Sequence, residues 1–364
     1  MRIGLVGLPL SGKSTIFNAL TRGAVRTGIF SAAREEVHVG VVEVPDTRVE
    51  TLSGILRPSK TTRAKMEYVD VVGIEKGAAR KTDSSVQFLA PVRQTDALLH
   101  VARAFVDESV PHPLGQVDSS RDMKALEEEF IIADLIAVEK RLEKVAKLAS
   151  VGKKPEEKGE PEILEKCRKY LLEEKPLREV ELTIEEQKLV RGFQFLSLKP
   201  LLVVVNVGED IEKDTEEAEI AEIAKTWAGK KRGIVSLCGK LEMEIAGASS
   251  RDAAELMELA GLSEPASLRV IRASYQLLGL ITFYTTVHSE LTAWPVVERT
   301  PAVRAAGEIH TDLEKGFIKA EVTAFDDLVS CGSIAKARER GLLRVEGRSY
   351  EVRDGDVLTI RFNP

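Results

Sequence analysis

The chain has 364 residues, of which 43% are hydrophobic and 30% charged, and its formal net charge is −6. This composition is typical of a globular protein of two or three domains, and it excludes both a disordered chain and one drawn to nucleic acid by overall charge. No apolar run reaches the roughly 18 residues that a membrane-spanning helix needs, and the three cysteines form neither a CxxC motif nor a Cys/His cluster. We therefore expect a reduced, cytoplasmic protein without a membrane anchor, a disulfide framework or a zinc site.

Short apolar segments separated by helical stretches dominate the first hundred residues and recur after residue 200. A Gly-rich turn follows the first segment, and residues 14–20 then have the apolar spacing of a helix. Such fully apolar strands favour a mostly parallel sheet covered by helices on both faces, the α/β class of the P-loop NTPases. The predicted strands are residues 2–7, 37–44, 66–72, 97–102, 201–207 and 234–237.

The stretch from Asp118 to Leu198 is more highly charged than the chain as a whole. Its apolar residues recur in alternating steps of four and three, which is the spacing of a coiled-coil seam. A polar turn at 152–161 and a second helix from Ile163 to Leu172 complete a helical hairpin inserted into the α/β domain. The hairpin is either a binding arm or a structural insertion, and its seam is covered either within the hairpin or by another subunit. The seam consists of Ile131, Leu135, Val138, Leu142, Val145 and Ala149.

The pattern changes again after about Gly279, where short β-rich stretches alternate with turns. We predict strands at 280–287, 317–322 and 357–362 and one helix at 334–339, which together make a small α+β domain. The predicted organisation is a nucleotide-binding domain (1–118 and 199–278), an inserted helical arm (119–198) and a C-terminal domain (279–364).

Residues 7–14, Gly-Leu-Pro-Leu-Ser-Gly-Lys-Ser, match the phosphate-binding pattern GxxxxGK[ST] at every specified position. Glycines let the backbone wrap closely around phosphates, the lysine supplies charge to the β- and γ-phosphates, and the serine hydroxyl is suited to Mg²⁺. A predicted strand before the loop and a helix after it support this assignment. The predicted nucleotide-binding residues of the loop are Leu8, Pro9, Leu10, Ser11, Gly12, Lys13, Ser14 and Thr15.

A second motif, Asp70-Val71-Val72-Gly73, follows the predicted strand at 66–72. At this distance from the phosphate loop we predict that Asp70 lies on the Mg²⁺ side, together with Ser14, and that Gly73 senses the γ-phosphate. Ras-type GTPases place a glutamine at the next position to orient the attacking water. Here it is Ile74, which has no polar atom in its side chain, so the water must be positioned by another group.

The base-binding elements are expected at the ends of the last two predicted strands. Asn206 and Glu209 stand where ordinary GTPases have the Asn and Asp of NKxD, and Val207 replaces the lysine that stacks on the base. Loss of a well-placed acceptor costs about 1–3 kcal/mol, enough to erase a preference for guanine. Cys238 and Gly239 are expected to close the base pocket through backbone groups, with Cys238 a small buried residue rather than a nucleophile.

Taken together, these motifs resemble the YchF subfamily of the Obg-related P-loop NTPases of the TRAFAC class. Asn206 and Glu209 are similar to the family's NxxE motif, the charged hairpin lies where the family has its helical arm, and residues 305–317 and 354–357 resemble its TGS domain. The resemblance runs nearly end to end. It implies Mg²⁺-dependent hydrolysis of ATP, often in preference to GTP, and association with ribosomes, ribosomal subunits or RNA. A hydrophobic residue in place of the catalytic glutamine, here Ile74, is also a family feature.

Several positions depart from the family pattern. Leu10 and Ser11 replace an Asn and a Val, and since that Asn helps to hold potassium in related NTPases, we do not expect potassium activation. Arg34-Glu35 replaces the Thr-Ile pair of the first switch, and the second switch carries Lys81, Asp83 and Ser85 in place of glycines. We therefore expect nucleotide binding to be retained better than turnover.

His112, between Pro111 and Pro113, aligns with a histidine of the family. A neutral imidazole can orient water or accept its proton near neutral pH, so His112 is the predicted catalytic side chain.

Three functions stay open at this point. The first is a slow Mg²⁺-dependent ATPase whose nucleotide state controls binding to a ribosome or RNA. The second is a nucleotide-gated binding module with weak or no hydrolysis, and the third is a GTPase proper. We expect a monomer.

Overall fold

The computed structural model describes residues 1–23, 25–29, 36–71, 74, 77, 89–150, 158–209, 213–227, 229–287 and 289–363. The chain divides into two compact units: an N-terminal unit of Met1–Val41 and Glu67–Ala273, and a C-terminal unit of Val42–Met66 and Ser274–Pro364. Residues 42–66 were predicted to lie in the nucleotide-binding domain, but they pack with the C-terminal residues. Their length and composition gave no sign of this, because the partner strand lies more than 200 residues later in the chain.

A seven-stranded sheet forms the core of the N-terminal unit, in the order β2-β3-β5-β1-β6-β7-β8. The pairings from β5 through β8 are parallel, with Leu5 opposite Asp70 and Leu99, whereas β2 and β3 form an antiparallel hairpin. The predicted α/β class is thus confirmed, with the edge strand β2 as an addition. The strands are β1 (Arg2–Val6), β2 (Val25–Ile29), β3 (Glu36–Glu43), β5 (Lys65–Asp70), β6 (Ala97–Arg103), β7 (Leu201–Asn206) and β8 (Arg232–Leu237).

Helices pack against this sheet because its central strands are mostly apolar, although β6 also carries His100 and Arg103. One hydrophobic cluster joins strand residues such as Leu98 and Val203 to Phe130 of α5 (Ser119–Ser150) and Trp227 of α8 (Lys213–Trp227). Within the described parts of the chain, every helix is too short or too polar to cross a membrane. The other helices of the sheet region are α1 (Lys13–Thr21), α4 (Ala90–Arg93), α9 (Gly239–Gly247), α10 (Ser250–Leu259) and α11 (Ala266–Leu277).

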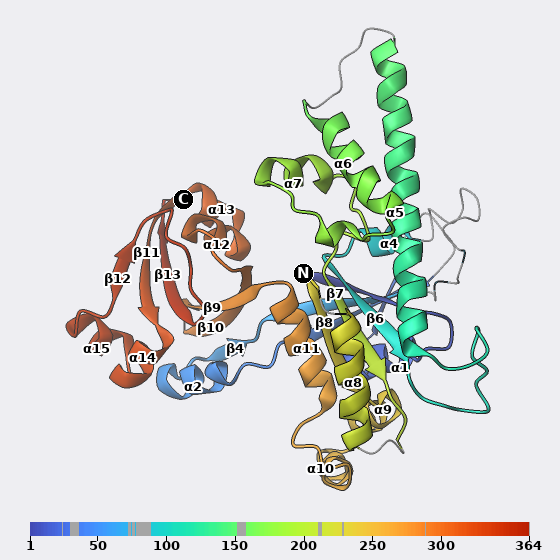
Figure 1. Ribbon diagram of the computed structural model, residues 1–364. Coiled ribbons are helices and arrows are strands. Elements are labelled where there is room, and N and C mark those ends of the chain that lie inside the picture. Colours follow the sequence, from blue (N-terminus) through green and yellow to red (C-terminus); the bar gives the residue numbers. More distant parts are fainter. Residues whose placement is uncertain are drawn as a thin grey trace. The chain divides into compact units, whose positions relative to one another are not determined.

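The inserted arm consists of α5, α6 (Glu160–Leu172), the 3-10 turn η2 (Leu177–Glu179) and α7 (Ile184–Arg191). Figure 1 shows α6 lying alongside the long helix α5. Val138 of the predicted seam is fully buried and packs in one cluster with Leu164 and Cys167 of α6. The seam is therefore covered within the chain, although Ala149 at its end is exposed.

A buried carboxylate fixes the base of the arm to the approach of β7. Asp134 on α5 accepts hydrogen bonds from the backbone amides of Leu196 (3.0 Å) and Ser197 (2.7 Å), and its ion pair with Arg93 measures 3.0 Å. Burial raises the pKa of Asp134, while Arg93 and the amide donors work against that shift. An arm anchored by several charge-assisted bonds holds one orientation relative to the strands below it.

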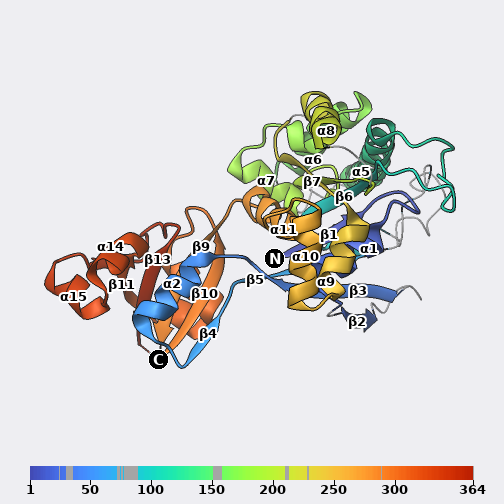
Figure 2. The same cartoon turned by 90° about the horizontal axis from the view of Figure 1, so that it is seen from below.

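The C-terminal unit contains a six-stranded sheet in the order β12-β11-β13-β9-β10-β4. Residues 60–62 form β4 and pair in parallel with Glu290–Thr292 of β10, which Figure 2 shows running side by side. Sequence patterns predicted β9, β11, β13 and the helix at 334–339, whereas the strands β4, β10 and β12 and the helices α2, α12, α13 and α14 were not predicted. The strands are β4 (Lys60–Thr62), β9 (Leu280–Val287), β10 (Glu290–Val297), β11 (Phe317–Ala324), β12 (Arg344–Glu346) and β13 (Asp356–Phe362), and the helices are α2 (Thr47–Leu56), α12 (Ala302–Ile309), α13 (Thr311–Lys315), α14 (Phe325–Cys331) and α15 (Ile334–Glu339).

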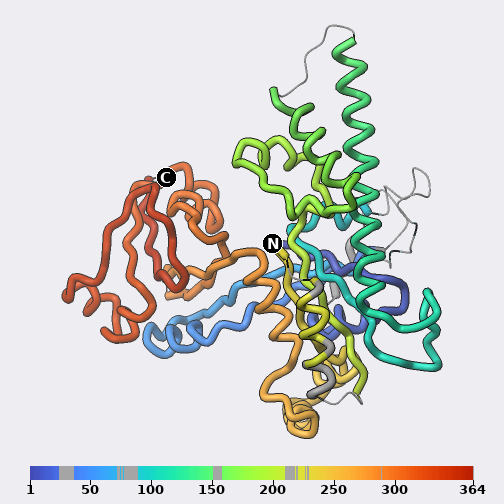
Figure 3. Tube along the Cα trace, in the orientation of Figure 1, coloured from blue at the N-terminus to red at the C-terminus, as the bar shows by residue number. Residues whose placement is uncertain are grey.

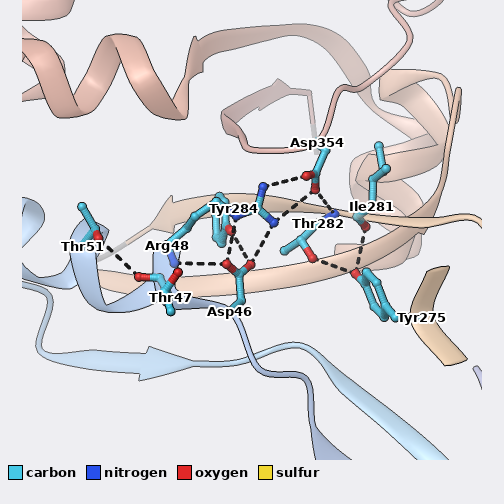
Figure 4. A network of polar contacts seen from close by, with 9 residues as sticks. All are labelled: Asp46, Thr47, Arg48, Thr51, Tyr275, Ile281, Thr282, Tyr284 and Asp354. Carbon is cyan, nitrogen blue, oxygen red and sulfur yellow. Dashed lines mark hydrogen bonds and ion pairs between the residues drawn. The ribbon is translucent and has the colours of Figure 1, made fainter. Parts of the chain in front are cut away.

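A polar network fastens residues 42–66 within this unit (Figure 4). Asp46 caps α2 by accepting from the Arg48 amide at 3.1 Å, and it also accepts from the Tyr284 hydroxyl at 2.5 Å. Arg48 binds Asp354 with two hydrogen bonds of 2.7 and 3.2 Å. Burial works to raise the pKa of Asp46, but its hydrogen bonds with Arg48 and Tyr284 outweigh burial and lower it. Figure 3 shows the same segment, in blue, beside the orange strands of the C-terminal sheet.

Candidate functional site

The loop between β1 and α1 follows a tight backbone path, and one of its positions, Gly12, leaves no room for a side chain. Gly12 has φ 90°, and a Cβ atom built there would lie 2.3 Å from Asn206 Nδ2, so no larger residue fits. Leu10 has φ 62°, a left-handed conformation that is uncommon outside glycine, and its side chain is 52% exposed. Leu8 is buried, and Pro9 and Thr15 are half-buried. The predicted phosphate loop therefore has the close-wrapped shape that its glycines allow.

Lys13 begins α1 and folds back over this loop. Its ammonium nitrogen donates to the Leu8 carbonyl at 3.2 Å, and the residue is 8% exposed. Burial lowers the pKa of Lys13, and nearby Asp70 partly offsets that effect. A cation held against backbone at the N-terminus of a helix is in place to meet an anionic group.

Ser14 and Asp70 meet at the ends of α1 and β5. The Ser14 hydroxyl donates to Asp70 Oδ2 at 2.9 Å, while Asp70 Oδ1 is buried without a hydrogen-bond partner among the described residues. Burial raises the pKa of Asp70, and Ser14 and Lys13 oppose that rise. A buried carboxylate oxygen with an open lone pair beside a hydroxyl suits a hard divalent cation such as Mg²⁺, which typically takes few protein ligands and several water or phosphate oxygens. The described residues contain no cluster of three or more His, Cys, Asp and Glu side chains that could hold a metal ion.

Asn206 at the end of β7 joins two loops with its side-chain amide. Its Nδ2 donates to the Ser11 carbonyl at 3.0 Å, and its Oδ1 accepts from the Gly239 amide at 2.9 Å. Both polar atoms of this buried side chain are therefore engaged. Asn206 therefore links the phosphate loop to the loop after β8.

Glu209 lies on the exposed rim beyond Asn206. Its Oε2 is 2.6 Å from the ammonium of Lys240, and both side chains are well exposed. Guanine recognition by an aspartate uses both carboxylate oxygens as acceptors, so binding in that mode would compete with Lys240 for one of them.

Val207 and Cys238 have their side chains turned toward protein rather than solvent. Val207 is 4% exposed within the sheet cluster, and its amide donates to the Leu237 carbonyl at 3.0 Å. Burial raises the pKa of the half-buried Cys238 thiol, which keeps it in the unreactive form. The Val207 side chain is therefore closed off from a base, whereas that of Cys238 stays partly exposed.

Ile74 replaces the usual water-orienting glutamine and is 1% exposed. Its side chain packs in the sheet cluster, and its amide donates to the Gly7 carbonyl at 3.0 Å. The segment after β5 is thereby tied to the phosphate loop through the backbone. Gly73 and the divergent switch positions Arg34, Glu35, Lys81, Asp83 and Ser85 lie outside the described residues.

His112 is held on both sides in the loop after β6. Its Nε2 lies 2.8 Å from Asp122 Oδ2, and its Nδ1 accepts from the Leu114 amide at 3.1 Å. This pattern assigns the proton to Nε2, and both ring nitrogens are occupied. The predicted catalytic role of His112 therefore requires one of these two bonds to open.

Arg103 is a site residue that sequence reasoning missed. This buried side chain donates to the carbonyls of Leu10 (3.4 Å) and Val110 (2.8 Å), and its guanidinium stacks 4.3 Å from the Phe105 ring centroid. It thus connects the phosphate loop to the loop that carries His112. An arginine at the end of an apolar strand carries no distinctive motif, so only its three-dimensional contacts show the role.

Two family models match the chain. Residues 2–140 match the family described as 50S ribosome-binding GTPase, and residues 280–363 match YchF-GTPase_C, described as a protein of unknown function. Among solved structures, the Schizosaccharomyces pombe YchF GTPase superposes with a TM-score of 0.79 at 25% identity, covering 99% of this chain and 97% of that one.

Curated relatives match over nearly their whole length. The protein named Ribosome-binding ATPase YchF of Bacillus subtilis is 41% identical over 361 residues, covering 99% of this chain and 98% of the relative. A protein of the same name from Escherichia coli O157:H7 is 39% identical over 363 residues, covering 100% and 99%. With relatives of this name 41% and 39% identical over nearly the full length of both chains, the chain belongs to the YchF family.

Proposed function

We propose that this chain binds a purine nucleoside triphosphate at residues 7–14 and hydrolyses it slowly with Mg²⁺, with ATP preferred over GTP. The contact that carries the proposal is the bond between Ser14 and Asp70, which leaves one buried carboxylate oxygen of Asp70 without a partner among the described residues. Together with Lys13 on the same loop, it supplies the charge and the oxygen ligands that a triphosphate with its metal requires.

Each predicted site residue has a distinct proposed part. Lys13 contacts the β- and γ-phosphates, and the loop from Leu8 to Thr15 surrounds them with its backbone N–H groups, which Pro9 alone lacks. Ser14 and Asp70 are the protein ligands of Mg²⁺. The bound ion would neutralise charge on the phosphate oxygens. Cys238 and Gly239 offer backbone groups to the base, Asn206 keeps their loop in place, and Gly73 is proposed to sense the γ-phosphate. His112 is proposed to orient the water after its bond to Asp122 opens.

The preference for ATP is supported by the ion pair between Glu209 and Lys240. A carboxylate already paired with an ammonium is a poor bidentate acceptor for guanine. Because Val207 is buried in the sheet cluster, its side chain cannot take the place of a lysine stacked on the base.

The name of these relatives, Ribosome-binding ATPase, supports a further part of the proposal: this chain associates with the ribosome or a ribosomal subunit in the cytoplasm. Bound nucleotide is proposed to control this association. The chain is proposed to act as a monomer, since the apolar seam of its arm is covered by its own helices in the described residues.

The test is a side-by-side calorimetric titration of ATP and GTP in the presence of Mg²⁺, followed by turnover with and without ribosomes. We expect ATP to bind more tightly than GTP. We expect Lys13→Ala to lower the affinity for both nucleotides by at least tenfold, because it removes a buried charge that pairs with the phosphates. If Lys13→Ala binds both nucleotides with unchanged affinity, the proposal is wrong.

Base preference is tested by Glu209→Asp, which shortens the side chain away from Lys240. We expect the ratio of ATP to GTP affinity to fall by about tenfold, since one well-placed acceptor contributes about 1–3 kcal/mol. Lys240→Met, which frees the carboxylate without shortening it, is the companion variant. If neither variant changes the ratio, the Glu209 side chain does not contact the base.

A nucleotide-gated binding module without hydrolysis is the second candidate, favoured by one observation: both ring nitrogens of His112 are occupied. It predicts tight nucleotide binding and nucleotide-dependent retention on ribosomes, with turnover no faster than in a His112→Ala variant. Turnover that falls in His112→Ala while ATP affinity holds favours the enzyme.

A further inference from the structure

We propose that a pocket at the base of the arm is a second binding site and that it holds phosphate groups of an RNA strand. The pocket has a volume of about 550 Å³ and lies where α7 and the loop after it meet the residues that precede β6, β7 and β8. The inference deepens the proposed association with the ribosome and rests on it, because it assigns the RNA-contacting surface.

Four cationic side chains line the pocket without a carboxylate partner. Lys188 and Arg191 lie on α7, Lys199 lies just before β7, and Lys231 just before β8. Among the described residues, no Asp or Glu oxygen comes within 4.0 Å of any of their charged nitrogens, whereas Arg141, Lys166, Arg168 and Arg178 of the arm are in ion pairs. In a chain with net charge −6, an unmatched group of four cations is a local departure from the average.

The remaining charged residues of the lining are Arg93 and Asp96. Arg93 is paired with the buried Asp134 at 3.0 Å. Asp96, the one carboxylate in the lining, accepts from the Arg2 amide at 2.7 Å. The lining therefore carries a net excess of positive charge, which Asp96 offsets only in part.

Lys199 is the innermost of the four. Its ammonium donates to the Thr95 carbonyl, and burial lowers its pKa to about 8, with Asp96 and Asp134 partly opposing and Arg93 adding to the shift. A bound anion would restore the missing counter-charge. This half-buried amine marks the floor of the pocket as an environment that favours a negatively charged ligand.

The arrangement of the cations favours a strand of phosphates over a single small anion. Lys188 and Arg191 are three residues apart on one exposed face of α7, while Lys231 is exposed on a separate loop. The charges are thus spread around an opening far larger than one phosphate group rather than converging on one point. Long basic side chains on the rim of a groove are the usual contacts to a nucleic-acid backbone, and they are independent of base sequence.

The pocket lies away from the nucleotide site within the same unit. Thr95, Pro200 and Lys231 precede β6, β7 and β8, whereas the phosphate loop follows β1. In a parallel sheet these are opposite edges, so RNA and nucleotide can be bound at the same time. Substitutions in the pocket therefore leave the nucleotide site intact.

The experiment compares the full-length protein with the triple variant Lys188→Gln/Arg191→Gln/Lys231→Gln. The matched control is Lys124→Gln/Lys225→Gln/Arg251→Gln, which removes the same charges from exposed positions outside the pocket. Affinity for a labelled single-stranded RNA and for purified ribosomes is measured from 50 to 200 mM salt, with ATP affinity measured in parallel. We expect the pocket variant to bind RNA at least tenfold more weakly, and its log–log salt slope to fall by about 0.7 for each phosphate that it no longer neutralises.

A second measurement needs no substitution. Lysines of the wild-type protein are methylated with and without saturating RNA and are quantified by mass spectrometry. We expect RNA to protect Lys188, Lys199 and Lys231, and to leave Lys124 and Lys225 reactive.

Other outcomes overturn the assignment. Equal losses of affinity in the pocket and control variants would mean that charge alone matters, and normal RNA binding by the pocket variant would place the contact elsewhere. Protection of the pocket lysines by inorganic pyrophosphate but not by RNA would identify a small-phosphate site instead. If wild-type protein binds ribosomes and the pocket variant binds equally well, only the pocket assignment fails; if wild-type protein binds neither ribosomes nor RNA, the proposed ribosome association fails with it.

Discussion

His100 is a buried polar residue of the N-terminal unit whose protonation affects the stability of the fold. His100 on β6 is 1% exposed, and its Nε2 has no hydrogen-bond partner among the described residues. Burial lowers its pKa to about 3, and the nearby charges of Lys13 and Arg178 add to the shift. The folded protein thus keeps this imidazole neutral under conditions in which the unfolded chain would protonate it.

This difference makes the protein sensitive to acid. Between pH 6.5 and about 3 the unfolded state binds a proton at His100 that the folded state does not, so stability falls as pH falls through that window. One such group contributes a slope of up to about 1.4 kcal/mol per pH unit. We expect the free energy of unfolding of His100→Gln to fall less steeply with decreasing pH than that of the wild type. Denaturant titrations at pH 7, 6, 5 and 4 measure this dependence.

His310 supplies the control, since its side chain is 64% exposed and caps α13. We expect His100→Gln to change the slope more than His310→Gln does. A His100→Gln protein with the wild-type slope would show that another group governs the acid response.

At the scale of the element, the arm depends on the apolar contact between α5 and α6. Leu164 of α6 is fully buried in this cluster, and Leu172 on the same helix is 56% exposed. We expect Leu164→Ala to lower the free energy of unfolding by about 2–5 kcal/mol, because a cavity remains in a packed interface. Leu172→Ala should change it by no more than about 0.5 kcal/mol. Chemical denaturation measures both, and similar losses of stability in the two variants would contradict this view of the interface.

Sequence patterns predicted the elements whose stability is local. The apolar strands, the phosphate loop and the seam of α5 each follow from residue spacing within a few turns or strands. β10 was not predicted because Trp294-Pro295 interrupts the usual strand pattern, although Pro295 is accommodated in the pairing of β10 with β9. Lys13, Ser14 and Asp70 were identified by motif, whereas Arg103 acts through backbone contacts that leave no pattern in the sequence.

At the scale of the whole molecule, the division into units does not follow the order of the chain. The backbone leaves the N-terminal unit after Val41, returns at Glu67 and leaves again after Ala273. Sequence patterns placed residues 42–66 with their neighbours in the chain, because contacts formed across such a separation have no local signal. The Asp46–Arg48–Asp354 contacts show where the segment belongs.

Arg48 tests that assignment in the intact chain. Its bidentate contact with Asp354 and its bonds to Asp46 lie wholly within the C-terminal unit. We expect Arg48→Ala to destabilise that unit by about 1–3 kcal/mol, since it removes hydrogen bonds to charged groups, and to leave ATP affinity unchanged. Hydrogen exchange resolved by peptide measures the local effect.

Arg57→Ala, at an exposed position just after the same helix, is the matched control. Faster exchange limited to residues 42–66 and 274–363 in Arg48→Ala supports the division into units. Equal protection in both variants would show that the network contributes nothing to holding the segment.

The pairing of β4 with β10 also constrains how the protein is made. Lys60 leaves the synthesising machinery about 230 residues before its partner Glu290. Until Glu290 has been synthesised, the backbone groups of β4 have no partner strand in β10. Contacts between residues so far apart in the chain also form slowly, because a long loop must close. The C-terminal sheet can be completed only after β13 has been synthesised, and until then the incomplete sheet presents an open edge to which a chaperone can bind.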